Sequence, residues 1–260
     1  MEEIESQKLL WKRPDNVPWP KVWHRFEAKS KSGQIYQIKI QDIPEDRFDD
    51  VLDFLAREFD KNEPISSCST VAHIFEDENV RLALRKVRRK ILEQRLSLFA
   101  VLDNNDPIPE IMGLELHLVE SHDEPPIKVP SVLYENLVME IVHAVHEQDD
   151  VSSTLFETKE YISDFNLSVA AKYYGLEISY HIYVALSKMA ATFNIGGALM
   201  TFSSRFAQRS AEKAGFKLIK ELKFQDFRDK DGNIKLPVEQ AESIKLMYAK
   251  YSVCGNPNNK

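Results

Sequence analysis

Residues 164–182, with the sequence DFNLSVAAKYYGLEISYHI, constrain the fold of this chain more than any other stretch. In their first part, apolar side chains alternate with polar or small ones at Phe165, Leu167 and Val169, which is the period of a β-strand. Past Gly175, apolar residues recur at helical spacing, at Ile178, Ile182 and Leu186. The stretch therefore predicts a strand that passes through a tight turn into a helix.

A junction of this kind is suited to binding an anion. It directs backbone N–H groups and the positive end of the helix dipole to one point, where a phosphate is stabilised. The alternative is an ordinary connection between a strand and a helix. The stretch on its own does not separate the two.

Part of this junction, the sequence LSVAAKYYGLEIS, resembles the strand-turn-helix of the GNAT superfamily of acyl-CoA N-acyltransferases. It is more closely similar to the insect-type arylalkylamine N-acetyltransferases, which often read L-S-V-x-P-x-Y-R-G-x-G-I-G here. In that family the turn holds the pyrophosphate of coenzyme A. The resemblance therefore implies acetyl-CoA as co-substrate and the following cofactor-binding residues: Leu167, Ser168, Val169, Lys172, Tyr174, Gly175, Leu176, Glu177, Ile178 and Ser179.

The loop departs from the family pattern at four positions. Ala171 stands for the proline, Tyr174 for the arginine, and Glu177 and Ser179 for two glycines. A glutamate adds a Cβ and a negative charge where a phosphate approaches. Two arrangements relieve this conflict: the side chain of Glu177 points to solvent, or Lys172 partly neutralises it. The match supports the fold better than the activity.

The composition is that of an ordinary globular protein of 260 residues, with a net charge of −7 that mildly favours cationic ligands. Its two cysteines, Cys68 and Cys254, suggest neither a disulfide framework nor a metal site. The acidic first residues predict no signal peptide, and no run of about 20 apolar residues predicts a membrane span. We expect a cytoplasmic monomer that binds a small amine, with no nucleic acid and no membrane as partner.

Three segments are expected along the chain. Residues 1–33 carry all three tryptophans among several prolines and predict an extended N-terminal arm, whose aromatic side chains either pack on the domain or line a site. Residues 34–252 form a single GNAT-like N-acetyltransferase domain. Residues 253–260 form a disordered tail.

Apolar periodicity gives the order of elements within the domain. It predicts strands over residues 34–40, 96–102, 111–119, 164–170, 196–202, 216–224 and 243–251, and helices over residues 48–59, 75–95, 133–146, after 175 and over 203–214. This order indicates an α+β (α/β three-layer) fold. It matches the GNAT order, which implies a mixed, mostly antiparallel sheet flanked by helices, with two parallel strands splayed apart at the cofactor cleft.

Glu63 is the candidate general base. Acetylation of an amine requires a group that removes a proton from the acceptor, and a buried carboxylate can serve. Insect-type relatives carry an F-x-x-x-E-P segment whose glutamate has this role, and Glu63 and Pro64 match it. The alternative is that Glu63 is one surface acid among the 41 acidic residues of the chain.

Ser203 and Ser204 are the candidate general acids. The segment TFSSRFAQRSAEKAGF resembles the family's T-x-F-S-x-R-x-A-x-K-x-G-F segment, in which a serine replaces the superfamily's tyrosine acid. Ala211 occupies the tyrosine position here, so that a tyrosine acid is excluded. The alternative is that one serine simply caps the following helix.

The histidines are weaker candidates. His143 and His146 lie one helical turn apart, a spacing that can bind a metal, but no third ligand is near them in the sequence. His117 lies in a predicted strand near the expected substrate cleft and is interpreted as a core or surface residue. No metal is expected.

Two functions fit this sequence. The resemblance implies transfer of an acetyl group from acetyl-CoA to a small primary amine of the arylalkylamine class. The altered residues Tyr174, Glu177 and Ser179 instead favour a catalytically impaired protein of GNAT fold that acts as a binding or regulatory module.

Overall fold

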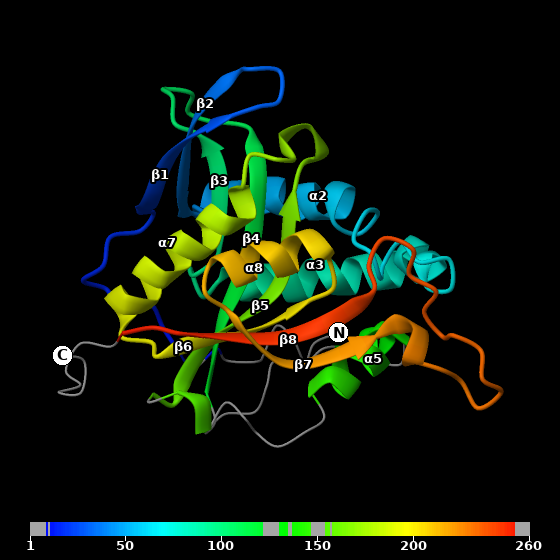
Figure 1. Ribbon diagram of the computed structural model, residues 1–260. Helices are drawn as coiled ribbons and strands as arrows, with labels where there is room; N and C mark the ends of the chain where they lie inside the picture. Colours follow the sequence, from blue (N-terminus) through cyan, green and yellow to red (C-terminus); the bar gives the residue numbers. More distant parts are fainter. Residues whose placement is uncertain are drawn as a thin grey trace.

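The computed structural model describes Leu9 and residues 11–121, 130–134, 137–146, 154–156 and 158–252. These residues form one twisted sheet with helices on both faces (Figure 1). The sheet contains eight strands: β1 (Val22–Lys29), β2 (Ile35–Asp42), β3 (Leu98–Leu102), β4 (Ile111–Ser121), β5 (Glu160–Val169), β6 (Gly197–Phe202), β7 (Lys217–Lys223) and β8 (Ser243–Lys250).

The strands lie in the order β1-β2-β3-β4-β5-β6-β8-β7. All neighbours are antiparallel except β5 and β6, which are parallel. This is the mixed, mostly antiparallel sheet predicted from the sequence. The prediction of one splayed parallel pair is also confirmed, because the register of β5 and β6 contains a single pair of residues, Ile162 and Ala198.

The helices make two outer layers (Figure 1). They are α2 (Phe48–Glu58), α3 (Glu78–Leu92), α4 (Ser131–Tyr134), α5 (Leu137–His146), α7 (Ile178–Phe193) and α8 (Arg205–Lys213). The first two of these cover one face of the sheet, and α7 and α8 cover the other. Four short 3-10 helices, η1 (Glu45–Arg47), η2 (Ala72–Glu76), η3 (Ala171–Tyr173) and η4 (Phe224–Asp226), connect the elements. Within the described ranges, no helix has the length and apolarity that crossing a membrane requires.

The N-terminal segment, predicted as an extended arm, contains a strand of the sheet. The range 1–33 contains β1, which pairs with β2 along its whole length and so makes residues 34–40 part of the second strand rather than the first. Trp23 of β1 is buried in the core, in an edge-on contact with Phe193 of α7. Its indole N–H donates to the buried carboxylate of Asp42, which Arg13 also contacts. Aromatic packing therefore anchors this segment to the domain.

Most of the other predicted helices and strands begin and end within a few residues of the observed ones. The helix predicted over 133–146 falls in α4 and α5, and residues 135–136 between them lie outside the described residues. The predicted tail, residues 253–260, lies outside them too. Gly215 follows α8 with φ of +93°, the left-handed conformation expected of a C-terminal stop.

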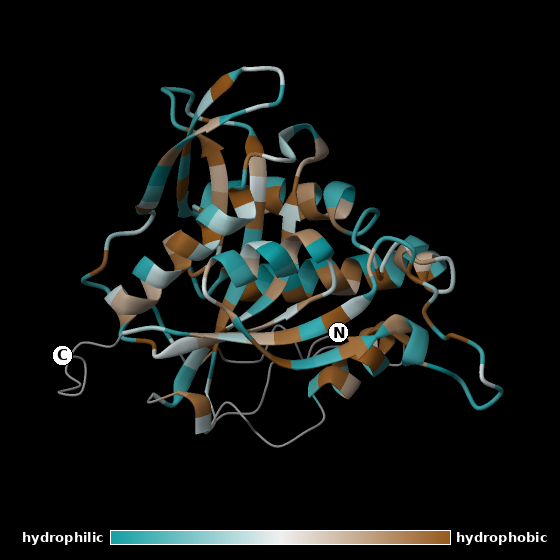
Figure 2. Ribbon diagram, in the orientation of Figure 1, coloured by the Kyte–Doolittle hydropathy of each residue, from teal (hydrophilic) through white to brown (hydrophobic). Residues whose placement is uncertain are grey.

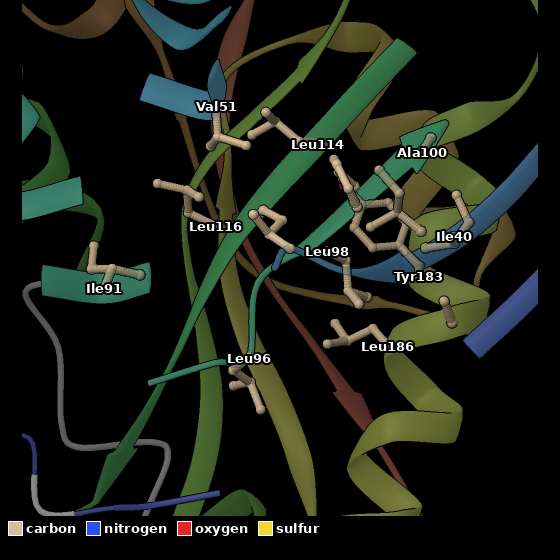
Figure 3. Close-up of a cluster of buried hydrophobic side chains, with 14 of the residues drawn as sticks. Ile40, Val51, Ile91, Leu96, Leu98, Ala100, Leu114, Leu116, Tyr183 and Leu186 are labelled. Atoms are coloured by element: carbon tan, nitrogen blue, oxygen red, sulfur yellow. The ribbon is translucent and has the colours of Figure 1, made fainter. Parts of the chain in front are cut away.

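The core fills the space between the sheet and both helix layers. Figure 3 shows Tyr183 and Leu186 of α7 packed beside Leu98 on one side, with Val51 and Leu116 on the other. All five side chains are almost completely buried. Hydrophobic residues accordingly concentrate in the central strands, and α8 carries hydrophilic residues on its outer side (Figure 2).

Candidate functional site

Two cavities meet where β5 and β6 separate. We call them the inner pocket, of about 380 Å³, and the outer groove, of about 530 Å³. The inner pocket lies between α3, α5, β5 and β6, whereas the outer groove follows the end of β5 and the starts of α7 and α8. Five residues line both cavities: Phe59, Glu63, Leu167, Ser204 and Ala207. Glu63 and Ser204 are therefore polar groups at the junction of the two cavities.

Glu63 is fixed in the turn that follows α2. Its backbone N–H donates to the carbonyl of Phe59, and its Oε2 accepts a hydrogen bond of 2.7 Å from the backbone N–H of Ser66. The buried Pro64 follows it, six positions after the last residue of α2. Oε1 of Glu63 accepts a hydrogen bond of 2.5 Å from the hydroxyl of Ser203. The two strongest catalytic candidates of the sequence are thus in direct contact, although 140 positions separate them.

The two adjacent serines have different contacts. Ser204 is the N-cap of α8, and its hydroxyl accepts from the backbone N–H of Phe206 at 3.3 Å. Ser203 lies between the end of β6 and that cap, and its hydroxyl reaches Glu63 instead. The capping alternative therefore describes Ser204, while Ser203 has the contact that proton transfer would need.

The inner pocket is mostly apolar, with several polar groups among its lining residues. Apolar walls come from α3, α5, β6 and the turn after α2, at Ile65, Phe75, Leu84, Val87, Val142 and Leu199. Asp164 and Thr201 lie at the base, and the side chain of Thr201 is 2.9 Å from Nε2 of His146. Arg88 also reaches the wall, but Asp60 and Asn166 occupy its guanidinium. An uncharged hydrophobic body would fit such a pocket.

Asp164 is a site residue that the sequence analysis did not single out. Burial, followed by the nearby carboxylate of Glu115, raises its pKa to about 8. One signal was present: an acidic residue in a central strand of the sheet is unusual and requires a partner. Its contact with Thr201 depends on how β5 and β6 separate, which no local pattern reports.

The outer groove contains eight of the ten predicted cofactor residues. These are Leu167, Ser168, Val169, Tyr174, Gly175, Glu177, Ile178 and Ser179. The other two lie elsewhere: Leu176 is buried in the core, and Lys172 pairs with Glu110 at the mouth of a neighbouring cavity. The backbone of Gly175 has φ of +87° and leaves open space where a Cβ would be, as a close approach of a ligand to the backbone requires.

Glu177 precedes α7 in the left-handed conformation, with φ of +57°. This conformation is strained for residues other than glycine. Its exposed carboxylate is 2.5 Å from the ammonium of Lys213 on α8. The charge is thus partly neutralised, but by Lys213 and not by Lys172, which has Glu110 as its partner.

Two further cations line the groove and were not predicted. Lys31 lies in the turn between β1 and β2, and Arg209 lies on α8. Neither forms an ion pair with another residue of the described ranges. Both come from segments distant from the loop in sequence. They face the same groove as the N-terminus of α7, whose backbone N–H groups favour anions.

The candidate histidines are not arranged as a metal site. Within the described part of the chain, no three His, Cys, Asp or Glu side chains gather in the way a metal ion requires. His146 contacts Thr201, and partial desolvation together with His143 lowers its pKa. His117 is completely buried and pairs with Glu115 at 2.9 Å.

Comparison with solved structures identifies the fold. The chain matches the Aedes aegypti protein assigned as arylalkylamine N-acetyltransferase 7 with a TM-score of 0.80 and 23% identity, over 92% of this chain and 99% of that one. It matches Aedes aegypti arylalkylamine N-acetyltransferase 2 with a TM-score of 0.71 and 17% identity, over 83% and 99%. It also matches a Drosophila melanogaster polyamine N-acetyltransferase with a TM-score of 0.61 and 13% identity, over 82% and 99%.

No family model and no curated protein matches the sequence. At these identities the likeness to solved structures shows the fold, which is the GNAT-like α+β fold expected from the sequence. Function has to be argued from the site itself.

Proposed function

We propose that this protein transfers the acetyl group of acetyl-CoA to a small primary amine. The observation that carries this proposal is the hydrogen bond of 2.5 Å between Ser203 and Glu63 at the junction of the two cavities. A carboxylate and a hydroxyl at such a junction can move a proton between an amine in one cavity and a thioester in the other.

Acetyl-CoA is the proposed occupant of the outer groove. The N-terminus of α7 and the open backbone at Gly175 suit the pyrophosphate, and Lys31 and Arg209 add positive charge. The thioester would then point into the separation between β5 and β6, towards Glu63 and Ser204. The solved structures of the same fold are described as N-acetyltransferases, which supports this placement.

An arylalkylamine is the proposed acceptor. The inner pocket has apolar walls, which suit an aromatic ring, and its polar groups lie at the base and at the junction. The three acidic residues of the pocket, Glu63, Glu120 and Asp164, lie among these apolar walls and can attract the single ammonium group of such an amine. Two of the solved structures named above carry the arylalkylamine name. We further propose a monomer in the cytoplasm, which the acidic composition and two cysteines support.

The proposed chemistry uses two side chains. Glu63 accepts a proton from the attacking nitrogen as the new C–N bond forms. The C–S bond then breaks, and Ser203 gives its proton to the leaving thiolate while Glu63 returns one to Ser203. Atoms and charge balance within this pair. General acid–base catalysis of this kind contributes about 10²–10⁴-fold in rate.

A binding or regulatory module is the second candidate. The observation that favours it is the carboxylate of Glu177 in the outer groove, at a position where the related loop has glycine. A module that has lost catalysis would leave acetyl-CoA intact in the presence of every amine.

The test combines binding and turnover. Titration calorimetry measures acetyl-CoA binding, and release of the coenzyme A thiol with 2-phenylethylamine or putrescine measures acetylation, with mass spectrometry of the product. We expect turnover with the aromatic amine, reduced about 10²–10⁴-fold in Glu63→Gln and unchanged in the exposed control Glu93→Gln. Binding without any product would establish the module instead.

A further inference from the structure

A cluster of buried polar side chains lies behind the junction, on the side of the sheet that faces α7. Glu115 lies opposite Leu98 in the register of β3 and β4, and therefore shares its face with Leu98, which packs against α7 (Figure 3). Glu115 and His117 are both 0% exposed and hydrogen-bond to each other at 2.9 Å. Their remaining polar atoms, Oε1 and Nδ1, have no partner among the described residues, and neither has the hydroxyl of Tyr183.

Asp164 connects this cluster to the inner pocket. It lies opposite His117 in the register of β4 and β5, at a β-bulge. It also fills the separation between β5 and β6, where its Oδ1 accepts from the backbone N–H of Thr201 at 3.1 Å. A side chain thus replaces the missing backbone partner of β6, and the same side chain lines the inner pocket.

Asp164 lines the same inner pocket as Glu63 and Ser203. Thr201 lies in β6, and Ser203 follows the last residue of that strand, two positions further on, which is about 7 Å of extended chain. An amine in the inner pocket therefore has Asp164, Thr201 and His146 among the polar groups that line its site.

The surroundings favour the protonated carboxyl. After burial, the carboxylate of Glu115 and then that of Glu120 raise the pKa of Asp164, against the hydrogen bond from Thr201. Burial, and after it the nearby Glu115, also raises the pKa of Tyr183 and Tyr251, so Glu115 acts on three neighbouring groups. A group that titrates near the working pH is well matched to accept and release a proton.

Acetylation of an ammonium needs more than one proton acceptor. The nitrogen loses two protons between the ammonium and the amide, and only one of them ends on the thiolate. The Glu63–Ser203 pair transfers the proton that ends on the thiolate. The first proton, whose loss creates the nucleophile, has to leave a pocket that both co-substrates occupy.

We propose that Asp164 is a second base of the site, which takes this first proton. Glu115, on the side of the sheet that faces α7, controls how strongly Asp164 binds that proton. The inference rests on the proposed function. The step is R–NH₃⁺ plus Asp164 carboxylate giving R–NH₂ plus Asp164 carboxylic acid. The acid returns its proton to solvent when the products leave.

The test follows the pH dependence of kcat/KM for 2-phenylethylamine together with a carbon-13 NMR titration of the aspartate carboxyls. We expect an ascending limb near pH 8 in the wild type, well below the ammonium's own titration near pH 10. Glu115→Gln should move both the limb and the titration of Asp164 to lower pH, by about one unit. Asp164→Asn should abolish the limb and reduce kcat/KM at pH 8 about 100-fold.

Controls keep the outcomes distinct. Asp231→Asn changes an exposed loop residue and should leave the ascending limb of the pH profile in place. If circular dichroism shows that Glu115→Gln is unfolded, Glu120→Gln takes its place, because Glu120 also raises the pKa of Asp164 after burial and Glu115. An unchanged limb in active Asp164→Asn would overturn the role of Asp164 alone. A wild type that acetylates no amine would overturn the proposed function and this role with it. A folded Glu115→Gln with an unmoved limb would remove Glu115 from the proposal.

Discussion

The hydroxyl of Ser203 donates to Oε1 of Glu63 at 2.5 Å, across the line where two cavities join. One residue comes from the turn after α2 and the other from the end of β6. Their contact exists only when the helix layer and the far half of the sheet are packed together. This makes the pair a direct reporter of an assembled site.

The two neighbouring serines should respond differently to alanine. Ser203→Ala removes the partner of Glu63, and we expect turnover to fall about 10²-fold or more with little change in stability. Ser204→Ala removes the N-cap of α8, and we expect the free energy of unfolding to fall by about 0.5–2 kcal/mol. Urea denaturation and steady-state kinetics of both variants check this. Equal losses of turnover in the two variants would contradict it.

Lys213 should support cofactor binding only through Glu177. Lys213→Ala leaves an unneutralised carboxylate in the outer groove, and we expect acetyl-CoA to bind about tenfold more weakly. In the background of Glu177→Gly the same change should have little effect, because there is no carboxylate to neutralise. Calorimetry on the two single variants and the double variant measures the coupling. Additive losses would show that Lys213 acts on the phosphates by itself.

Restoring the family loop should tighten binding. The triple change Tyr174→Arg, Glu177→Gly and Ser179→Gly adds a cation, removes a carboxylate and relieves the left-handed backbone at Glu177. We expect acetyl-CoA to bind at least tenfold more tightly than to the wild type, whose binding should also weaken steeply with salt. Wild-type affinity equal to that of the triple variant would refute this account of the loop.

Acid should destabilise the contact between β1 and α7. Lys188 donates to Nδ1 of His24, and Nε2 of His24 is 3.0 Å from Nδ1 of His181, an arrangement that requires both rings to be neutral. Burial lowers the pKa of both, that of His181 to about 4. Because the unfolded chain binds these protons from about pH 6.5 downwards, the contribution is complete above that pH and is lost as the pH falls towards 4.

Denaturation at pH 7 and pH 5 measures this effect. His181→Gln removes one ring and should lessen the loss of stability between the two pH values. The exposed His73→Gln serves as the matched control and should leave it unchanged. An equal loss in the wild type and His181→Gln would contradict the argument.

The fold was predictable because its signals are local. Alternation and helical spacing located nearly every element, and the strand-turn-helix of residues 164–182 appeared as β5, η3 and α7. The strand β1 was not predicted, because the prolines and tryptophans that precede it indicated an extended arm. Its ladder with β2 and the burial of Trp23 outweighed the local preference.

The site was predictable only where a motif marked it. Glu63 and Ser203 came from resemblance, and their contact could not be deduced from spacing. Lys213 is 36 positions from Glu177 and meets it because α8 packs on α7. Asp164 depends on a bulge and on the separation of two strands, which are properties of the assembled sheet.

The seam between β5 and β6 divides the chain as well as the sheet. Glu63 and Asp164 precede it, whereas Thr201 and Ser203 follow it, so the order of synthesis completes the site last. A nascent chain that ends before β6 holds both carboxylates without a hydroxyl partner and without the amide that bonds Asp164. Two fragments produced by a cut before residue 197 should likewise be inactive when separate and should regain activity when they associate.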